Sequence, residues 1–270
     1  MTRLDGGVLA PKLVEKPWGC DTLPKPFAAP AGQRIGEIWF EPPPELETLL
    51  AKYLFTSEAL SVQVHPDDAR APQGARGKEE CWLVLDAEPG ARLAIGFQRP
   101  VSEDELRTAA QDGSVEELLA WHPVRGGDFF YLPAGTVHAI GAGVTIAELQ
   151  QNSDVTYRLY DYGRPRELHL DEALQVADRD VYADPRRHHV APDQVVTLVD
   201  GPHFRLDQVV GVPNEATRAR FSKPLMILPL EGEVTIGDDR IVAGGCGWAS
   251  NLDRVQFGAG ARALLLSACQ

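Results

Sequence analysis

Cysteine is scarce in this chain: four cysteines occur among 270 residues, and they lie far apart. Cys20, Cys81, Cys246 and Cys269 form no CxxC pair, so a zinc finger is not indicated. Four isolated thiols in a chain of this length also do not resemble the dense disulfide framework of a small secreted domain. The cysteine content therefore predicts a reduced, cytoplasmic protein.

Positive charge is scarce too. The 26 Lys and Arg residues are outnumbered by 39 Asp and Glu, which gives a net charge of −13. Such a chain repels phosphate backbones and anionic membrane surfaces, so neither nucleic acid nor a membrane is expected as its main partner. An anionic substrate would need cations concentrated locally at its binding site.

Long apolar runs are missing as well. No run approaches the ~20 residues that a membrane span requires. Residues 1–13 lack the basic and then apolar plan of a secretory signal. These absences favour a soluble globular protein.

Short apolar segments separated by Gly and Pro turns dominate the first two thirds of the chain. Strands are predicted at residues 35–40, 61–65, 80–85, 92–97, 129–132, 136–140, 144–150 and 155–162. Many short strands punctuated in this way are typical of an antiparallel sandwich or barrel. The predicted fold class is therefore all-β.

Helical patterns are few. Ser102 is followed by Glu105, and Ser114 by Glu117, and each pair has the spacing of a capping box. We therefore predict a small helical insertion of two short helices near residues 102–121.

Two other segments carry their own predictions. Residues 1–34 are rich in Pro and Gly and are predicted to form an extended arm anchored by Trp18. Residues 45–52, which follow three prolines, are predicted to form a short helix.

The strand pattern breaks at residues 186–189, Arg-Arg-His-His, and this segment is predicted to be a solvated linker. Further strands are expected after it, at residues 204–210, 223–230, 233–236, 240–243 and 261–267. This part echoes the turns of the first half without its histidines. We expect one domain over residues 1–185 and a second, chemically silent β domain over residues 186–270.

Candidate ligands for a metal begin in the strand at residues 61–65. Its alternation places Ser61, Gln63 and His65 on one face and two valines on the other. A lone histidine on a strand is more often a structural residue with a satisfied hydrogen bond, so this strand alone is weak evidence.

Two further candidates, Glu80 and His138, lie at the edges of later strands. Glu80 alone could be a surface carboxylate, and His138 alone could bond a backbone carbonyl. Together with Gln63 and His65, however, they form a nitrogen and oxygen donor set that suits Zn, Mn, Fe, Co or Ni. The four residues together favour a metal site.

Two cations accompany these candidates. Lys78 precedes Glu80 by two residues, and Arg158 lies between aromatic residues. A cation beside a metal is costly unless an anion is to bind there. The alternative is that Lys78 is solvated and Arg158 pairs with Asp154 or Asp161; the residues alone do not decide between the two.

Four motifs, in order, resemble the type I mannose-6-phosphate isomerases, a cupin family, in their short bacterial form. They are Ser-Val-Gln-Val-His-Pro-Asp-Asp (61–68), Gly-Lys-Glu-Glu-Cys-Trp (77–82), Leu-Pro-Ala-Gly-Thr-Val-His-Ala-Ile (132–140) and Glu-Leu-Gln-Gln-Asn-Ser-Asp-Val-Thr-Tyr-Arg-Leu-Tyr-Asp-Tyr (148–162). The resemblance runs from about residue 16 to residue 173. Beyond residue 181 it is little more than length and a strand pattern.

The resemblance implies a bicupin, that is, two antiparallel jelly-roll β-barrels, of which the first holds the metal and the second is metal-free. It implies one Zn²⁺ per chain, although other divalent ions fit the same donors. The implied zinc ligands are Gln63, His65, Glu80 and His138. The implied substrate- and phosphate-binding residues are Ser61, Lys78 and Arg158, with a catalytic role for Arg158 as well. The chain lacks the helical domain of the longer members.

The activity implied is the interconversion of mannose 6-phosphate and fructose 6-phosphate through a cis-enediolate, whose negative charge a metal or a guanidinium can stabilise. The general base is left open among Glu148, a metal-bound water and Lys78. The rival hypotheses are another metal-dependent cupin enzyme and a non-catalytic sugar-phosphate-binding cupin. The oligomeric state cannot be predicted from these residues.

Overall fold

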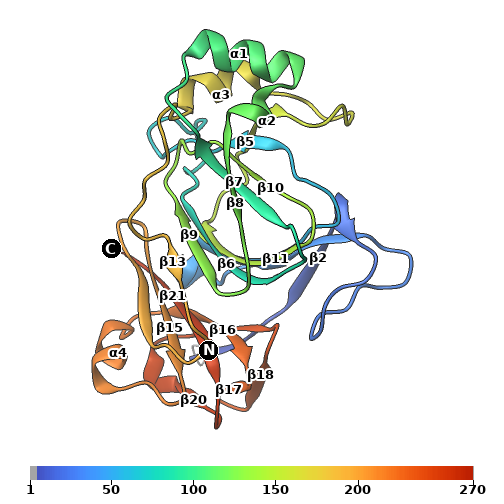
Figure 1. Cartoon of the computed structure of the whole chain (residues 1–270). Helices are drawn as coiled ribbons and strands as arrows, with labels where there is room; N and C mark the ends of the chain where they lie inside the picture. Colours follow the sequence, from blue (N-terminus) through green and yellow to red (C-terminus); the bar gives the residue numbers. More distant parts are fainter. Residues whose placement is uncertain (1–4, 270) are drawn as a thin grey trace.

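The protein is built mostly of β-strands, in a computed structural model that describes residues 5–269. Its strands form four sheets arranged as two β units, one above the other, with most of the helices at the far end of the upper unit (Figure 1). This confirms the prediction of a mostly β fold with few helices. No helix in the described range is both long and apolar enough to cross a membrane.

The first β unit consists of two antiparallel sheets. The five-stranded sheet has the order β12-β5-β10-β7-β8 and the seven-stranded sheet the order β13-β9-β6-β11-β4-β3-β2. The strands of the smaller sheet are β5 (Val62–Val64), β7 (Arg92–Phe97), β8 (Leu119–Pro123), β10 (His138–Ile140) and β12 (Tyr157–Tyr160). Those of the larger sheet are β2 (Pro11–Cys20), β3 (Ile35–Phe40), β4 (Leu49–Phe55), β6 (Glu80–Ala87), β9 (Asp128–Leu132), β11 (Val144–Gln151) and β13 (His188–His189).

The second β unit has a six-stranded and a three-stranded sheet. The six-stranded sheet contains β1 (Gly6–Leu9), β14 (Val196–Asp200), β15 (Phe204–Val210), β16 (Leu225–Glu231), β19 (Cys246–Ala249) and β21 (Arg262–Ala268). The three-stranded sheet contains β17 (Glu233–Ile236), β18 (Asp239–Val242) and β20 (Val255–Phe257). All five strands predicted in this part of the sequence are confirmed, whereas β14, β19 and β20 were not predicted.

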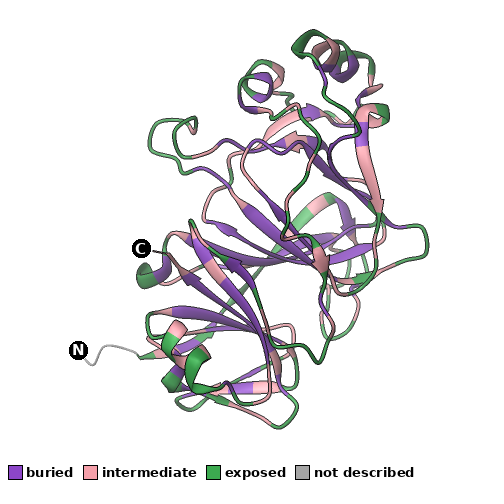
Figure 2. Ribbon diagram, turned by 60° about the vertical axis from the view of Figure 1, so that its left-hand side comes forward, coloured by how far each residue is buried: buried purple, intermediate pink, exposed green. Residues whose placement is uncertain are grey.

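The sheets and helices are stacked in layers with a core between each pair. Helices α1 (Glu103–Asp112) and α3 (Leu170–Val176) cover the outer face of the five-stranded sheet, where Val62 and Val64 are fully buried. Trp82 and other apolar residues fill the space between the two sheets of the first unit. Figure 2 shows the resulting contrast between buried central strands and exposed loops.

The seven-stranded sheet is buried on both faces, because its outer face packs against the six-stranded sheet of the second unit. Every residue of β4 is buried as a consequence. The helix predicted at residues 45–52 is therefore wrong: a 3₁₀ turn at Pro44–Leu46 leads directly into β4. A strand buried on both faces has no apolar alternation by which its sequence could be distinguished from a helix.

The N-terminal arm contains two strands, β1 and β2, which connect the two units. β2 is the edge strand of the seven-stranded sheet, whereas β1 pairs with β19 in the second unit. Trp18, on β2, is only 3% exposed and packs between the sheets of the first unit, as the anchor predicted for it.

The segment at residues 186–189 is not a linker. His188 and His189 form β13, which pairs with Phe129 and Asp128 of β9. The chain therefore completes the first sheet before it enters the second unit. A two-residue strand is too short to leave a sequence pattern, which explains the incorrect prediction.

The helical insertion begins as predicted. The Ser102 hydroxyl accepts a hydrogen bond from the Glu105 amide at 3.2 Å and caps α1. The second helix, α2 (Val115–Leu118), is a single turn that follows Ser114. The Ser114 hydroxyl donates a hydrogen bond to Asp112 and does not cap this helix.

Replacing Trp18 with alanine is expected to destabilise the protein by about 3–5 kcal/mol, because the indole is buried and its removal leaves a cavity. Equilibrium denaturant unfolding measures this change. Val212→Ala, at a side chain that is 71% exposed, is the control and should stay within about 0.5 kcal/mol of the parent protein. Equal, small effects from both substitutions would contradict the packing described for Trp18.

Candidate metal centre

The pairing of three short strands brings the predicted ligands together. On the five-stranded sheet, β5 lies between β10 and β12, so that Gln63 is directly opposite His138 on one side and Arg158 on the other. Glu80 begins β6 on the facing sheet. Residues that are 17 to 95 positions apart in the chain thus face one space between two sheets.

Three of these side chains form a compact cluster. His65, Glu80 and His138 are all buried, and each offers a ligand atom within 4.8 Å of the others. The shortest distances are 3.5 Å from His138 Nε2 to Glu80 Oε1 and 3.7 Å from His65 Nε2 to Glu80 Oε2. Two imidazoles and a carboxylate around one point are a common donor set for zinc.

Backbone carbonyls fix both imidazole rings from behind. His65 Nδ1 lies 2.8 Å from the Val155 oxygen, and His138 Nδ1 lies 2.9 Å from the Thr136 oxygen. Each Nδ1–H group therefore donates a hydrogen bond to a carbonyl oxygen. This leaves the Nε2 atom of each ring unprotonated, with its lone pair facing the cluster. Burial lowers the pKa of both histidines, that of His65 further through the nearby Lys78 ammonium, and so favours neutral rings.

The fourth predicted ligand, Gln63, reaches the same point. Its amide nitrogen lies 3.2 Å from His138 Nε2, while its oxygen accepts from the Ser61 hydroxyl at 3.2 Å. A half-turn of the amide would direct the oxygen inward. Oε1 of the Glu80 carboxylate, a residue that is 1% exposed, has no hydrogen-bond partner among the described residues, which is the condition expected of a metal ligand. The donor set therefore fits a divalent metal.

Lys78 lies inside this cluster. Its ammonium is 2.6 Å from Glu80 Oε2 and 3.0 Å from His65 Nε2, and it is 3.4 Å from Glu148 Oε1 on β11. With 5% of the residue exposed, the alternative of a solvated Lys78 is wrong. Burial would by itself raise the pKa of Glu80, but the adjacent Lys78 and His138 lower it below its ordinary value.

The charge network continues into residues that the sequence analysis missed. Lys52 on β4 is 2.8 Å from Glu148, and its pKa is raised because Glu148 and Glu37 outweigh the effect of burial. Glu37 on β3 is in turn 3.4 Å from Lys16. A lysine inside the apolar run Leu-Leu-Ala-Lys-Tyr-Leu-Phe is unusual, and this feature could have identified Lys52 from the sequence.

Arg158 stands beside the cluster without an acidic partner among the described residues. The alternative pairing with Asp161 is wrong, because Asp161 is held by Arg166 at 2.6 Å and by Arg164 at 3.1 Å. No contact with Asp154 takes its place. Arg158 Nε is buried and makes no hydrogen bond, and its pKa is lowered by burial and by the neighbouring Arg166.

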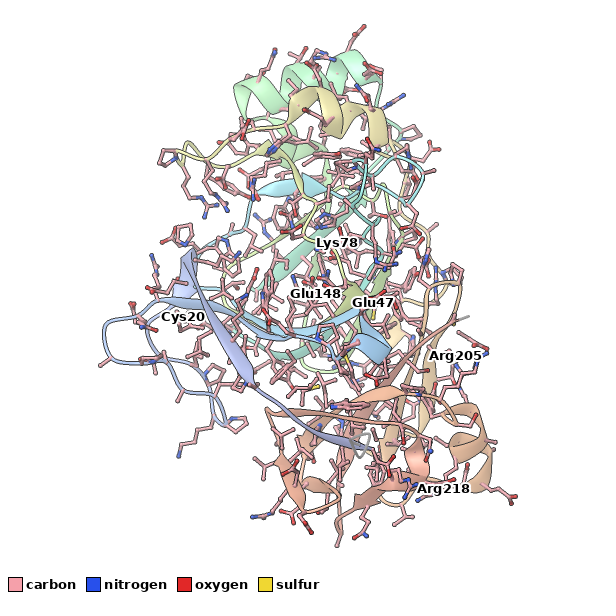
Figure 3. All side chains as sticks on the ribbon, turned by 180° about the vertical axis from the view of Figure 1, so that it is seen from behind. Cys20, Glu47, Lys78, Glu148, Arg205 and Arg218 are labelled. Carbon is pink, nitrogen blue, oxygen red and sulfur yellow. The ribbon has the colours of Figure 1, made fainter. Side chains whose placement is uncertain are left out.

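A single pocket lies beside the cluster and is lined by its neighbours Gln63 and Lys78. Ser61, Arg158 and Arg166 also line it, as do Lys16, Glu37, Lys52 and Glu148 of the seven-stranded sheet. Figure 3 shows Lys78 and Glu148 together in the interior of the first unit. Five of these side chains are cationic in a protein of net charge −13, so the pocket is suited to an anion.

The fold and the cluster define a mostly β protein with a histidine- and carboxylate-lined centre beside a pocket rich in cationic side chains. No protein-family model matches the chain. Among curated proteins it is 40% identical over 199 residues to mannose-6-phosphate isomerase ManA of Bacillus subtilis, covering 68% of this chain and 62% of that protein. It is 32% identical over 240 residues to the probable mannose-6-phosphate isomerase GmuF of the same species, covering 82% and 74%.

Solved structures agree with these relatives. The crystal structure of the mannose 6-phosphate isomerase from Bacillus subtilis matches with a TM-score of 0.78 at 26% identity, over 97% of this chain and 99% of that one. A zinc-bound mannose 6-phosphate isomerase matches in fold with a TM-score of 0.71 at 14% identity, over 98% and 100%. The chain belongs to the mannose-6-phosphate isomerase family, as its motifs predicted. It spans a little over three fifths of the length of ManA in the sequence alignment.

The lowered histidine pKa values predict an acid-labile metal-free protein. Because the unfolded chain takes up protons near the ordinary histidine pKa of 6.5 while buried His65 and His138 resist them, stability should fall as the pH drops from about 7 to 5. Each proton contributes up to about 1.4 kcal/mol per pH unit. Denaturant unfolding at several pH values measures this slope.

His65→Gln should reduce the slope, whereas Val212→Ala, at an exposed side chain that does not titrate, should leave it unchanged. An unaltered slope in the His65 variant would contradict a neutral, buried His65.

Proposed function

We propose that the protein is a metal-dependent aldose–ketose isomerase that interconverts mannose 6-phosphate and fructose 6-phosphate. One observation carries this proposal: the cluster of His65, Glu80 and His138 adjoins, through its contacts with Gln63 and Lys78, the pocket that Arg158 also lines. A Lewis-acid site and an anion site next to each other match a phosphorylated sugar whose carbonyl must be polarised. The names of the curated relatives support the same reaction.

We assign Gln63, His65, Glu80 and His138 as the ligands of one zinc ion. The donor types and the carbonyl-anchored rings support this assignment, as does the fold shared with a zinc-bound isomerase. When bound, zinc would polarise the oxygens at the two reacting carbons and stabilise the negative charge of the cis-enediolate.

The remaining pocket residues bind and orient the substrate. We assign the phosphate to Arg158, Lys78 and Ser61, because Arg158 has no acidic partner in the described structure and a phosphate would supply one. Arg158 is also the register partner of Gln63 on the next strand, and both residues line the pocket, so its guanidinium can stabilise charge that develops there.

Glu148 is the general base in this proposal. It lines the pocket, and the ammonium groups of Lys52 and Lys78 lie 2.8 and 3.4 Å from its oxygen. A carboxylate at this place can take a proton from one carbon and return it to the next. Lys78, engaged with Glu80 and Glu148, donates hydrogen bonds and is the weaker candidate for a base.

For the architecture we propose a bicupin. Residues 1–185, with β13 added to their larger sheet, would carry the metal in the first jelly roll, and the rest of residues 186–270 would form a metal-free second one, with β1 exchanged into its sheet. The two stacked pairs of antiparallel sheets support this view. All four cysteines are free thiols, which supports a cytoplasmic location.

A turnover assay tests the proposed activity. Chelator-treated protein should be inactive, and zinc should restore conversion of mannose 6-phosphate, while free mannose and glucose 6-phosphate should not be converted at a comparable rate. Stoichiometric zinc uptake without turnover would instead indicate a non-catalytic sugar-phosphate-binding protein. Turnover of unphosphorylated sugar would contradict the phosphate-binding role given to Arg158 and Lys78.

Arg158→Ala should lower kcat/KM by about 100- to 1000-fold, as expected for the loss of a group that stabilises charge in the transition state. Zinc content should remain at one per chain, because Arg158 is not a ligand. Arg205→Ala, on the second β unit, is the control and should retain full activity. If turnover survives in the Arg158 variant, its assigned role is wrong.

A further inference from the structure

A histidine of the second β unit, His203, contacts the loops that flank the metal centre of the first. His203 immediately precedes β15, and its backbone oxygen accepts from the Cys269 amide at 3.0 Å, next to the end of β21. The sheet of the second unit therefore fixes the position of this residue. Arg205, two residues farther along β15, is labelled in Figure 3.

The His203 ring lies between two carboxylates of the first unit. Nδ1 is 3.7 Å from Asp68 Oδ2, and Nε2 is 3.6 Å from Glu79 Oε1. Both distances are longer than a hydrogen bond. The ring is therefore held between the two acidic side chains and keeps them apart.

Both carboxylates belong to loops that carry metal-site residues. Asp68 follows His65 by three positions, and Glu79 stands between Lys78 and Glu80. The other oxygen of Glu79 accepts a hydrogen bond from the Tyr131 hydroxyl, which leaves Oε1 to face His203. A shift of either loop would therefore move a proposed ligand.

The two loops are also braced to each other. The Gly77 amide donates to Asp68 Oδ1 at 2.8 Å, and the Lys78 amide donates to the Pro66 oxygen at 2.9 Å. A Cβ on Gly77 would lie 2.4 Å from the Asp68 amide nitrogen, so only glycine permits this approach. Gln151 completes the brace: its side chain accepts from the Glu79 amide at 2.9 Å and donates to Asp68 at 3.2 Å.

We propose that His203 is a positioning residue through which the second β unit holds the metal-binding loops of the first in register. It touches neither the ligands nor the pocket, and acts through Asp68 and Glu79. This gives the second unit a defined role in the site. The inference rests on the proposed metal site.

The test is zinc affinity in the full-length chain, measured by competition with a chelator of known affinity. His203→Ala should weaken zinc binding by about 3- to 10-fold. Loss of a residue that hydrogen-bonds a metal ligand directly costs about 10- to 100-fold, and His203 acts one contact farther away. At saturating zinc the kcat of the variant should stay within about 2-fold of the parent value, so that only the zinc concentration needed for activity increases.

His189→Ala is the matched control. Its imidazole also pairs with an aspartate of the first unit, 2.9 Å from Asp128, but Asp128 lies at the opposite end of β9 from Leu132, the residue paired with Glu80. Its zinc affinity should be unchanged. Equal losses in both variants would show a general effect on stability and overturn the proposal.

A double-mutant cycle with Asp68→Asn tests the route of the effect. If His203 acts through Asp68, the double variant should lose less affinity than the sum of the single changes. Additive losses, or parental affinity in His203→Ala, would overturn the inference. Failure of the proposed function would appear instead in the parent protein, as absence of zinc binding or of turnover.

Discussion

The first β unit depends on the mutual compensation of buried charges. Lys52, Glu148, Lys78 and Glu80 follow one another at 2.6 to 3.4 Å between two sheets, each with 6% or less of its surface exposed. An isolated charge in this position would be strongly destabilising, whereas a chain of alternating signs can be accommodated. Removing any one member would take an opposite charge away from each of its neighbours, so the site and the stability of this layer are coupled.

Strand alternation explains how a catalytic pocket and a hydrophobic core share one sheet. On β11, Glu148 and Ile146 face the space between the two sheets of the first unit, while Ala147 and Leu149 face the second unit. The same alternation separates Lys52 from Tyr53 on β4. The second unit thus covers the reverse face of the sheet that carries the site, and contacts its loops through His203.

Sequence was sufficient where chemistry is concentrated in short motifs, and insufficient where burial hides the pattern. The alternation of 61–65 placed Ser61, Gln63 and His65 on one face, and the turn at 133–135 preceded the strand of His138 as expected. In contrast, the sequence of β4 shows no alternation of apolar and polar residues, because both faces of the strand are buried. Lys52 and Glu37 lie near the site only because their strands pair in the folded sheet. The partner of His203 also depends on the docking of two units, which no local pattern encodes.

The position of bound zinc is the most direct test of this account. Anomalous diffraction from zinc-loaded crystals, recorded on both sides of the zinc edge, should show one strong peak per chain among His65, Glu80 and His138, with the Gln63 oxygen turned toward it. A peak elsewhere, for example at His188 and His189, or the absence of a peak in protein that turns over mannose 6-phosphate, would contradict the central claim.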